Sequence, residues 1–130
     1  MRATVFRAKD DEGRWRRGFI LPFEDGVGLL YERDPEDPTI CGLVGHYVDQ
    51  ETVGEYTGIA DSQANPIFEG DILETETYGV VEVIFANAMF ETRYFLKDGN
   101  EHRIPFYAVG IMKVIGNIHD NPELMKGGER

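Results

Sequence analysis

Two carboxylates stand on either side of a glycine in the segment Glu69-Gly70-Asp71. Acidic side chains held close together could exchange a proton in acid–base catalysis or bind a metal ion. Such chemistry also needs a pocket and shifted pKa values, which the sequence does not display. The alternative is structural, with Gly70 forming a turn and Asp71 accepting hydrogen bonds from nearby backbone N–H groups at the start of a strand. We favour this structural interpretation.

The other residue types that bind metals or attack substrates are scattered. His46, His102 and His119 are far apart, and no Cys-x-x-Cys pair or His pair at a spacing of four aligns ligands. Cys41 precedes His46 by five residues, but no third group is identified that would orient a catalytic pair. The sequence therefore predicts no catalytic residue, no metal site and no cofactor.

Two further segments combine glycine with residues that bond to the backbone. In Tyr56-Thr57-Gly58 a strand ends at a glycine. In the run from Gly116 to Pro122, oxygen atoms of Asn117, Asp120 and Asn121 could accept bonds from exposed N–H groups as a strand gives way to a helical turn. Pro122 suits the first position of that helical turn. Both segments are thus expected to be structural.

Charge is distributed unevenly along the 130 residues, which carry a net charge of −11. The first 20 residues have a local balance of +3, whereas the stretch from Pro22 to Tyr78 holds fourteen acidic residues and one base, Arg33. Non-specific binding to nucleic acid depends on Lys and Arg releasing counterions from the phosphates. The acidic stretch would repel a phosphate backbone, and direct binding to nucleic acid is not expected.

The basic start allows two interpretations. Arg14, Arg16 and Arg17 could fold against the acidic body and neutralise it at short range, which would lower the self-repulsion of the chain. They could instead form a separate surface that binds an anion or a protein partner. We favour the first interpretation and keep the second as the candidate partner surface.

Short strands and turns account for most of the chain. Residues 1–8 and 15–21, joined by Asp11-Glu12-Gly13, predict a hairpin. Further strands are expected at the following positions: residues 43–48, 53–57, 68–73, 80–85, 91–96, 101–104 and 111–115. Turns or loops are expected at residues 23–26, 34–38, 61–66 and 97–100. A short helical turn follows Pro122, and residues 125–130 form a flexible tail.

This spacing of strands predicts a mainly β protein and not a βαβ fold. We expect a single domain covering residues 1–130. Residues 1–50 would form the N-terminal hairpin and an irregular segment. Residues 52–124 would form a small, strongly bent antiparallel barrel of the SH3-like kind, which ends in the helical turn. An aromatic cluster in the C-terminal half is expected to pack mainly in the core, and it includes Phe85, Phe90, Tyr94, Phe106 and Tyr107.

Three ordered motifs carry a resemblance to a known family. They are residues 55–61 (EYTGIAD), residues 65–73 (NPIFEGDIL) and residues 113–124 (KVIGNIHDNPEL). In this order and register they resemble the YopX family of phage and prophage proteins. Val5-Phe6-Arg7-Ala8 and Trp15 are also similar to the family's opening element. The resemblance implies an origin in a mobile element and a bacterial host, but it implies no particular activity.

We therefore expect a non-enzymatic binding or assembly module that acts through protein–protein contacts. Its partner would be an unknown protein or a second copy of the chain. An acidic mimic of DNA that inhibits a DNA-binding protein is the alternative, and a metal-dependent hydrolase is a third possibility. No apolar run approaches the roughly 20 residues that cross a bilayer, and the single cysteine fits a reducing compartment. The expected location is the cytoplasm of the bacterial host, away from the membrane.

Overall fold

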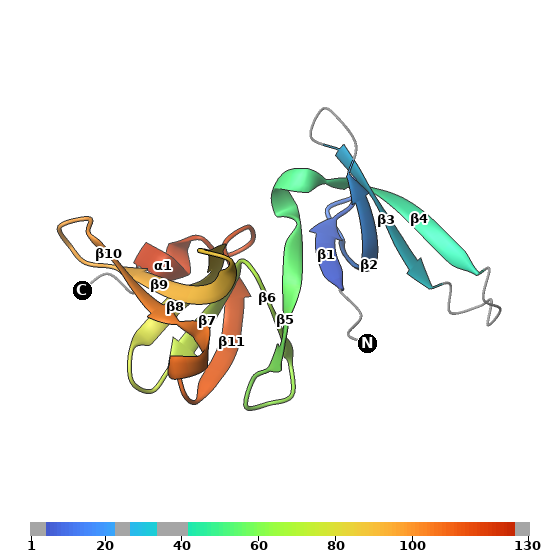
Figure 1. Ribbon diagram of the computed structural model, residues 1–130. Coiled ribbons are helices and arrows are strands. Elements are labelled where there is room, and N and C mark those ends of the chain that lie inside the picture. Colours follow the sequence, from blue (N-terminus) through green and yellow to red (C-terminus); the bar gives the residue numbers. More distant parts are fainter. Residues whose placement is uncertain (1–4, 23–26, 34–41, 127–130) are drawn as a thin grey trace. The chain divides into compact units, whose positions relative to one another are not determined.

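The computed structural model describes residues 5–22, 27–33 and 42–126, and most of them lie in β-strands (Figure 1). Contacts between residues divide the chain into two compact units, residues 1–56 and 57–130. Strand β5, Gly54–Ala60, begins in the N-terminal unit and continues into the C-terminal unit. No helix in the described ranges is long and apolar enough to cross a membrane.

The N-terminal unit begins with the expected hairpin. It consists of β1 (Phe6–Lys9) and β2 (Trp15–Pro22), which pair in antiparallel register. The Asp10 carboxylate fixes the turn by accepting hydrogen bonds from the N–H groups of Glu12 and Arg14, both at 2.9 Å. The following elements are β3 (Val27–Arg33), β4 (Leu43–Asp49) and the 3-10 turn η1 (Gln50–Thr52). The expected turn at residues 23–26 and loop at residues 34–38 lie outside the described residues.

Strand β2 changes partner half-way along its length. Its first half pairs with β1, and from Phe19 onward it pairs with β3. Gly18 stands at this change, where an added Cβ would lie 2.0 Å from the backbone oxygen of Tyr31. Only glycine therefore allows the two strands to approach so closely. A single antiparallel bridge between Asp10 and Val48 also connects β4 to the end of β1. The four strands curl around a small core of Ala8, Leu30 and Val48.

The C-terminal unit contains the second sheet and the helix. Its elements are β6 (Pro66–Phe68), β7 (Asp71–Thr75), β8 (Gly79–Ala86), β9 (Met89–Phe95), β10 (Glu101–Pro105), η2 (Phe106–Ala108), β11 (Met112–Asn117) and α1 (Glu123–Lys126). The strand order in the sheet is β10-β9-β8-β7-β11, and each pairing is antiparallel. All strands expected in this half are present within a few residues. Helix α1 includes residues 125 and 126, the first two residues of the expected tail.

Alternation along these strands separates the core of the C-terminal unit from its surface. The buried residues are Ile67, Leu73, Val81, Val83 and Phe106, and partly buried residues pack against them, including Phe90 and Tyr94. The expected aromatic cluster is therefore divided. Phe106 lies in the core, whereas Phe85 and Tyr107 are largely exposed.

The closed SH3-like barrel is not confirmed, because the described residues form two antiparallel sheets and no ladder joins β10 to β11. The reason lies at the sheet edges. Along β11, the N–H of Val114 donates to the Asp61 carboxylate at 2.9 Å, and the oxygen of Met112 accepts from the N–H of Ser62 at 3.1 Å. The loop after β5 thus occupies backbone groups that a closing strand would use. On β10, Pro105 has no N–H to donate.

Candidate functional site

The outer face of β2, β3 and β4 carries apolar side chains that do not enter the core. Leu30 and Val48 are buried, so their neighbours Leu29, Tyr31 and Tyr47 lie on the opposite side of the strands. Register places Phe19 beside Tyr31 and Leu29 beside Tyr47. We call Phe19, Leu29, Tyr31, Leu43 and Tyr47 the outer apolar face.

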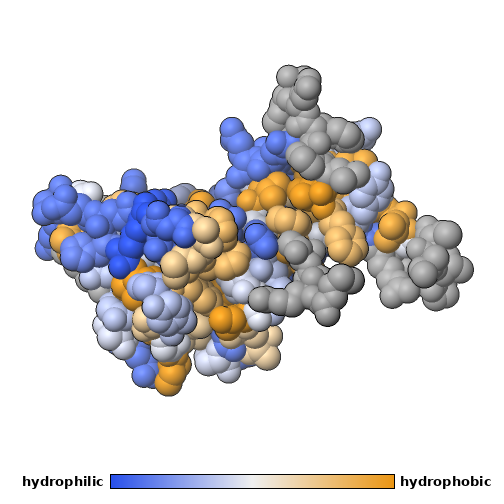
Figure 2. All heavy atoms as spheres, viewed as in Figure 1, coloured by the Kyte–Doolittle hydropathy of each residue, from blue (hydrophilic) through white to orange (hydrophobic). Residues whose placement is uncertain are grey.

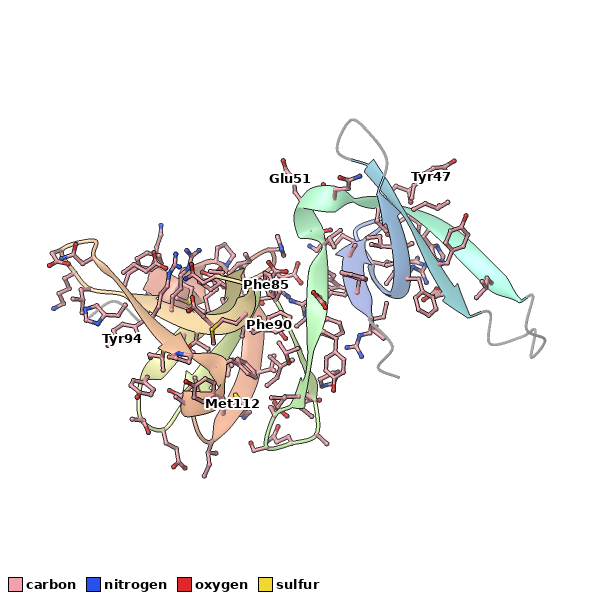
Figure 3. All side chains as sticks on the ribbon, viewed as in Figure 1. Tyr47, Glu51, Phe85, Phe90, Tyr94 and Met112 are labelled. Atoms are coloured by element: carbon pink, nitrogen blue, oxygen red, sulfur yellow. The ribbon has the colours of Figure 1, made fainter. Side chains whose placement is uncertain are left out.

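Three members of the outer apolar face are mostly in solvent, since Phe19 is 58% exposed, Leu43 53% and Tyr47 66%. Figure 2 shows apolar residues at the surface of this unit, and Figure 3 shows Tyr47 projecting from β4. An aromatic side chain carries about 150–250 Å² of surface, so Phe19 and Tyr47 together leave roughly 250 Å² exposed. With Leu43 added, this approaches the size at which an apolar patch is often a binding site, about 300–600 Å².

Basic residues adjoin one end of the outer apolar face. Arg17 precedes Phe19 by two positions on β2 and therefore lies on the same side of the strand. Register places Arg17 beside Arg7 and Trp15 beside Lys9. The guanidinium of Arg7 lies 4.8 Å from the centre of the Trp15 ring, and the ammonium of Lys9 lies 5.4 Å from it. The indole is therefore engaged by two cations.

Arg16 points to the other side of β2 and belongs to a chain of charged groups. Its Nε lies 2.9 Å from Asp10 Oδ2, and its second nitrogen, NH1, lies 3.2 Å from Glu32 Oε1. The same Glu32 oxygen lies 2.8 Å from Nε2 of His46. The N–H of Arg14 contributes most to holding the pKa of Asp10 below its ordinary value, and Arg16 adds to this effect although burial opposes it. Asp10 in turn raises the pKa of Arg16.

The three arginines of the predicted partner surface are thus not brought together. Arg16 is used inside the unit by Asp10 and Glu32. Arg17 lies on the outer side, and Arg14 lies in the turn with an exposed ion pair to Glu12 at 3.2 Å. Arg16 is paired with acidic residues of its own unit, as the first interpretation of the basic start expects, whereas Arg17 adjoins the outer apolar face.

The family-motif residues in the β5–β6 and β6–β7 segments hold loops of the C-terminal unit. Thr57 donates from its hydroxyl to the oxygen of Ile67 at 2.8 Å, and Gly58 has a φ of 86°. Asp71, which is 1% exposed, accepts a hydrogen bond from the N–H of Phe68 at 2.7 Å. Gly70 separates Glu69 from Asp71 with a φ of 91°. The bond expected for Asp71 and the turn expected at Gly70 are both present.

The last motif fixes the passage from β11 to α1. Asn117 Oδ1 accepts from the N–H groups of His119 and Asp120 at 3.0 and 2.9 Å. Asn121 Oδ1 accepts from the N–H of Asn117 at 3.3 Å, and Pro122 precedes α1 directly. A Cβ on Gly116 would lie 2.6 Å from Asn121 Oδ1, so Gly116 leaves the space that the asparagine fills.

These motifs coincide with a family match. The family model for "YopX protein" covers residues 24–126 of this chain. The chain belongs to the YopX family. The matched range contains Tyr31, Tyr47 and all the motif residues, whereas β1, Arg14, Arg17 and Phe19 precede it. The similarity noted for Val5–Ala8 and Trp15 therefore falls outside the match.

One solved structure supports the fold of this YopX family member. It is the crystal structure of protein EF1440 from Enterococcus faecalis, with a TM-score of 0.54 and 22% identity, over 95% of this chain and 98% of that chain. No curated protein matched the sequence. The comparisons thus establish a family and a shared fold.

Asp61, in the first family motif, accepts several backbone hydrogen bonds. Its Oδ1 accepts from the N–H groups of Gln63 and Asn65 at 2.9 and 2.8 Å, and its Oδ2 accepts from the N–H of Val114. Burial raises the pKa of Asp61, but bonds from Val114, Asn65 and Gln63 outweigh this effect and lower it overall. Asp61 therefore fastens the β5–β6 loop to the edge of the second sheet.

Two arginines of the second sheet are paired with acids. Arg93 contacts Glu82 through two bonds of 3.1 and 3.3 Å, and Arg103 contacts Glu101 at 2.7 Å. The hydrogen bond from Arg103 is the main cause that lowers the pKa of Glu101. Arg103 NH1 also lies 3.7 Å from Glu91 Oε2. Arg93 and Arg103 lie near the aromatic cluster in the sequence, and both are used in these pairs.

The acidic stretch is also partly used internally. Among its described residues, Glu32 is paired with Arg16, and Asp61 and Asp71 accept backbone bonds. Asp49, Glu51, Glu74 and Glu76 are exposed. No group of three or more His, Cys, Asp or Glu residues within the described ranges is arranged to hold a metal. Cys41 lies outside those ranges.

Sequence reasoning did not single out Tyr31 or Tyr47 as site residues. The segment LVGHYVD alternates Leu43 and Tyr47 on one face with Val44, His46 and Val48 on the other. Both faces contain apolar residues, so periodicity alone does not tell which face meets the core. The register with β3 shows which residues share a face, and the burial of Leu30 and Val48 shows which face meets the core.

Proposed function

We propose that this YopX family member is a non-enzymatic binding module that docks a protein partner on the outer apolar face. The proposal places this binding in the cytoplasm of a bacterial host, in a protein of mobile-element origin. The observation that carries it is the exposure of Phe19 on β2 and of Leu43 and Tyr47 on β4, the two strands that flank β3. A sheet holds these side chains in fixed relative positions, so a partner finds a prepared surface.

The chemistry of the face also favours a particular kind of partner. Its centre is apolar and aromatic, and Arg17 precedes Phe19 by two positions on β2. A flat apolar surface with an acidic group beside it would cover the rings and pair with Arg17. Interfaces of this kind place aromatic and Arg residues at the positions that contribute most to affinity.

Single-stranded nucleic acid is a weaker fit to the same surface. The exposed rings of Phe19 and Tyr47 could stack on bases, but binding also needs cations along the phosphate backbone. The net charge of −11 opposes a polyanion. This charge supports a protein partner.

Affinity capture from bacterial lysate tests the proposal with the purified chain as bait. The variant Phe19→Ser with Tyr47→Ser removes the two most exposed rings of the outer apolar face. The control Ile111→Ser changes a residue of the C-terminal unit that is 61% exposed. We expect the double variant to lose a partner that both the wild type and the control retain.

Two results would contradict the proposed function. One is equal recovery of every partner by the wild type and the outer-face variant. The other is recovery that weakens steeply with salt and is displaced by duplex DNA, which would favour the acidic mimic instead. Both measurements use the same bait and lysate.

A further inference from the structure

The sheets end in strands that pair on one side, and most of these edges are protected. An edge strand presents backbone N–H and C=O groups that another chain can use, and proteins protect it with charge, proline, short length or a covering loop. Strand β10 carries Glu101 and Arg103 and ends at Pro105. The loop after β5 occupies the edge of β11. Strand β6 has three residues and begins with Pro66.

Strand β4 is an edge that lacks these protections (Figure 1). The strand order in the N-terminal unit is β4-β3-β2-β1, and β4 pairs with β3 along its whole length in continuous register. Its sequence, LVGHYVD, contains no Lys, Arg or Pro, and its one acidic residue, Asp49, is the last. Among the described residues, its outer edge meets another strand at one bridge, from Val48 to Asp10. Residues 43–47 thus form an open edge.

Backbone geometry determines what can occupy this open edge. Every second residue of an edge strand points its N–H and C=O groups away from the paired strand, at a spacing of about 6.7 Å. An extended chain matches this spacing, whereas a helix uses its backbone groups internally. On the outer side, an added strand would place side chains beside Leu43 and Tyr47, which are 53% and 66% exposed. The open edge therefore fits an extended segment with apolar residues at alternate positions.

We infer that the open edge of β4, residues 43–47, adds an extended segment of a partner protein to the sheet. The segment covers Leu43 and Tyr47 with alternate apolar residues, and it lacks acidic residues because this chain has a net charge of −11. The same charge opposes a second copy of the chain as the occupant. This inference rests on the proposed function, because it specifies the kind of segment by which the partner binds.

Amide hydrogen exchange of the full chain, followed residue by residue by NMR, tests the open edge with a synthetic peptide. The probe is acetyl-Lys-Val-Thr-Val-Thr-Val-Lys-amide. The control is the same peptide with a methyl group on every backbone nitrogen, which removes its donors. Backbone hydrogen bonds give small net gains, so we expect binding at roughly millimolar peptide. The probe should slow exchange within residues 43–47 and leave β10 unchanged, and the methylated control should slow neither.

Three results of the exchange experiment would overturn the inference. The first is a probe that slows no exchange in β4. The second is equal slowing in β4 and β10, because the protected edge of β10 should not add a strand. The third is exchange at residues 43–47 that slows without peptide as the protein concentration rises, because a second copy of the chain would then occupy the edge.

Gly45 lies in the middle of the open edge and provides a matched pair of variants. A Cβ at this position would meet only side chains, and Gly45→Ala and Gly45→Lys add the same Cβ. Only the lysine also adds a charge that an incoming strand must cover. In the lysate capture, Gly45→Lys should lose a partner that Gly45→Ala retains. Circular dichroism checks that both variants are folded.

The same capture separates this inference from the proposed function. If Phe19→Ser with Tyr47→Ser loses a partner that Gly45→Lys retains, strand addition to β4 is wrong while the proposed docking function stands. If the outer-face variant and Gly45→Lys both recover every partner of the wild type, both proposals fail.

Discussion

The two units use their polar and apolar side chains in different ways. The C-terminal unit uses its family-motif residues to hold its own loops, where Asp61, Asp71, Asn117 and Asn121 bond to loop backbone. Within its described residues, the N-terminal unit has a core of three buried apolar residues and leaves aromatic rings on its outer side. The difference indicates that motif residues maintain the fold of one unit, while the other presents a surface.

The strongest test of this comparison is at Gly18, where the N-terminal unit depends on close approach of two backbones. Gly18→Ala should lower the free energy of unfolding by about 3 kcal/mol or more, because its Cβ would overlap the Tyr31 oxygen. Denaturant unfolding measures the change.

Gly45→Ala is the matched control for Gly18. Its Cβ would meet only side chains, the ring of Tyr31 at 3.2 Å and Leu29 at 3.4 Å, and a side chain can shift more easily than a backbone. We expect a loss below about 1 kcal/mol. Equal losses for the two alanine variants would show that the close approach at Gly18 is not what limits the unit.

The corresponding test in the C-terminal unit is Asp61→Ala. It leaves the N–H groups of Gln63, Asn65 and Val114 without their acceptor, and we expect a loss of about 2–3 kcal/mol. Asp61→Asn keeps one oxygen and should cost less. Thermal and denaturant unfolding check both variants. An Asp61→Ala variant as stable as the wild type would contradict the role assigned to Asp61 in holding this loop.

Acid should destabilise both units, with a smaller effect than removal of Asp61. The folded protein lowers the pKa of Asp10 in the N-terminal unit and of Asp61 in the C-terminal unit. As the pH falls, the carboxylates of the unfolded chain therefore bind protons first, near the ordinary aspartate pKa of about 4. Stability is complete above that value and falls as the pH drops through the folded pKa values.

Unfolding measured from neutral pH down to about 3 tests this dependence. Asp10→Asn and Asp61→Asn should each flatten the decline, because each removes one carboxylate with a lowered pKa. Profiles that run parallel to the wild type would show that these two groups do not determine the acid sensitivity.

The smallest expected effect on stability lies on the outer apolar face. Phe19→Ser with Tyr47→Ser should change the free energy of unfolding by less than about 1 kcal/mol, because both rings are mostly in solvent already. The same variant should lose binding, as described above. A large loss of stability, measured by denaturant unfolding, would show that the rings belong to the core and would remove the contrast between the units.

Local sequence predicts most of the strands, but it takes the segment of β3 (Val27–Arg33) as irregular, and it does not predict how the strands close. The β-branched run at residues 80–85 became β8, and Asp98-Gly99 became the turn before β10. The expected barrel at residues 52–124 failed at its edges, where Asp61 engages Val114 at a separation of 53 residues. The bridge from Asp10 to Val48 in the other unit likewise has no local pattern that marks it.

The sequence by itself determined the mainly β class, the turns at residues 61–66 and 97–100 and the family, because β propensity, glycine at positive φ and the ordered motifs are local properties. Only the tertiary structure decided which side of each strand meets the core. Successive side chains of a strand point to opposite faces, so Arg16 and Arg17 must lie on different sides of β2. The pattern does not say which of the two faces inward. Pairing between distant strands settles that choice, and it is this pairing that leaves Phe19, Tyr31 and Tyr47 on one outer face.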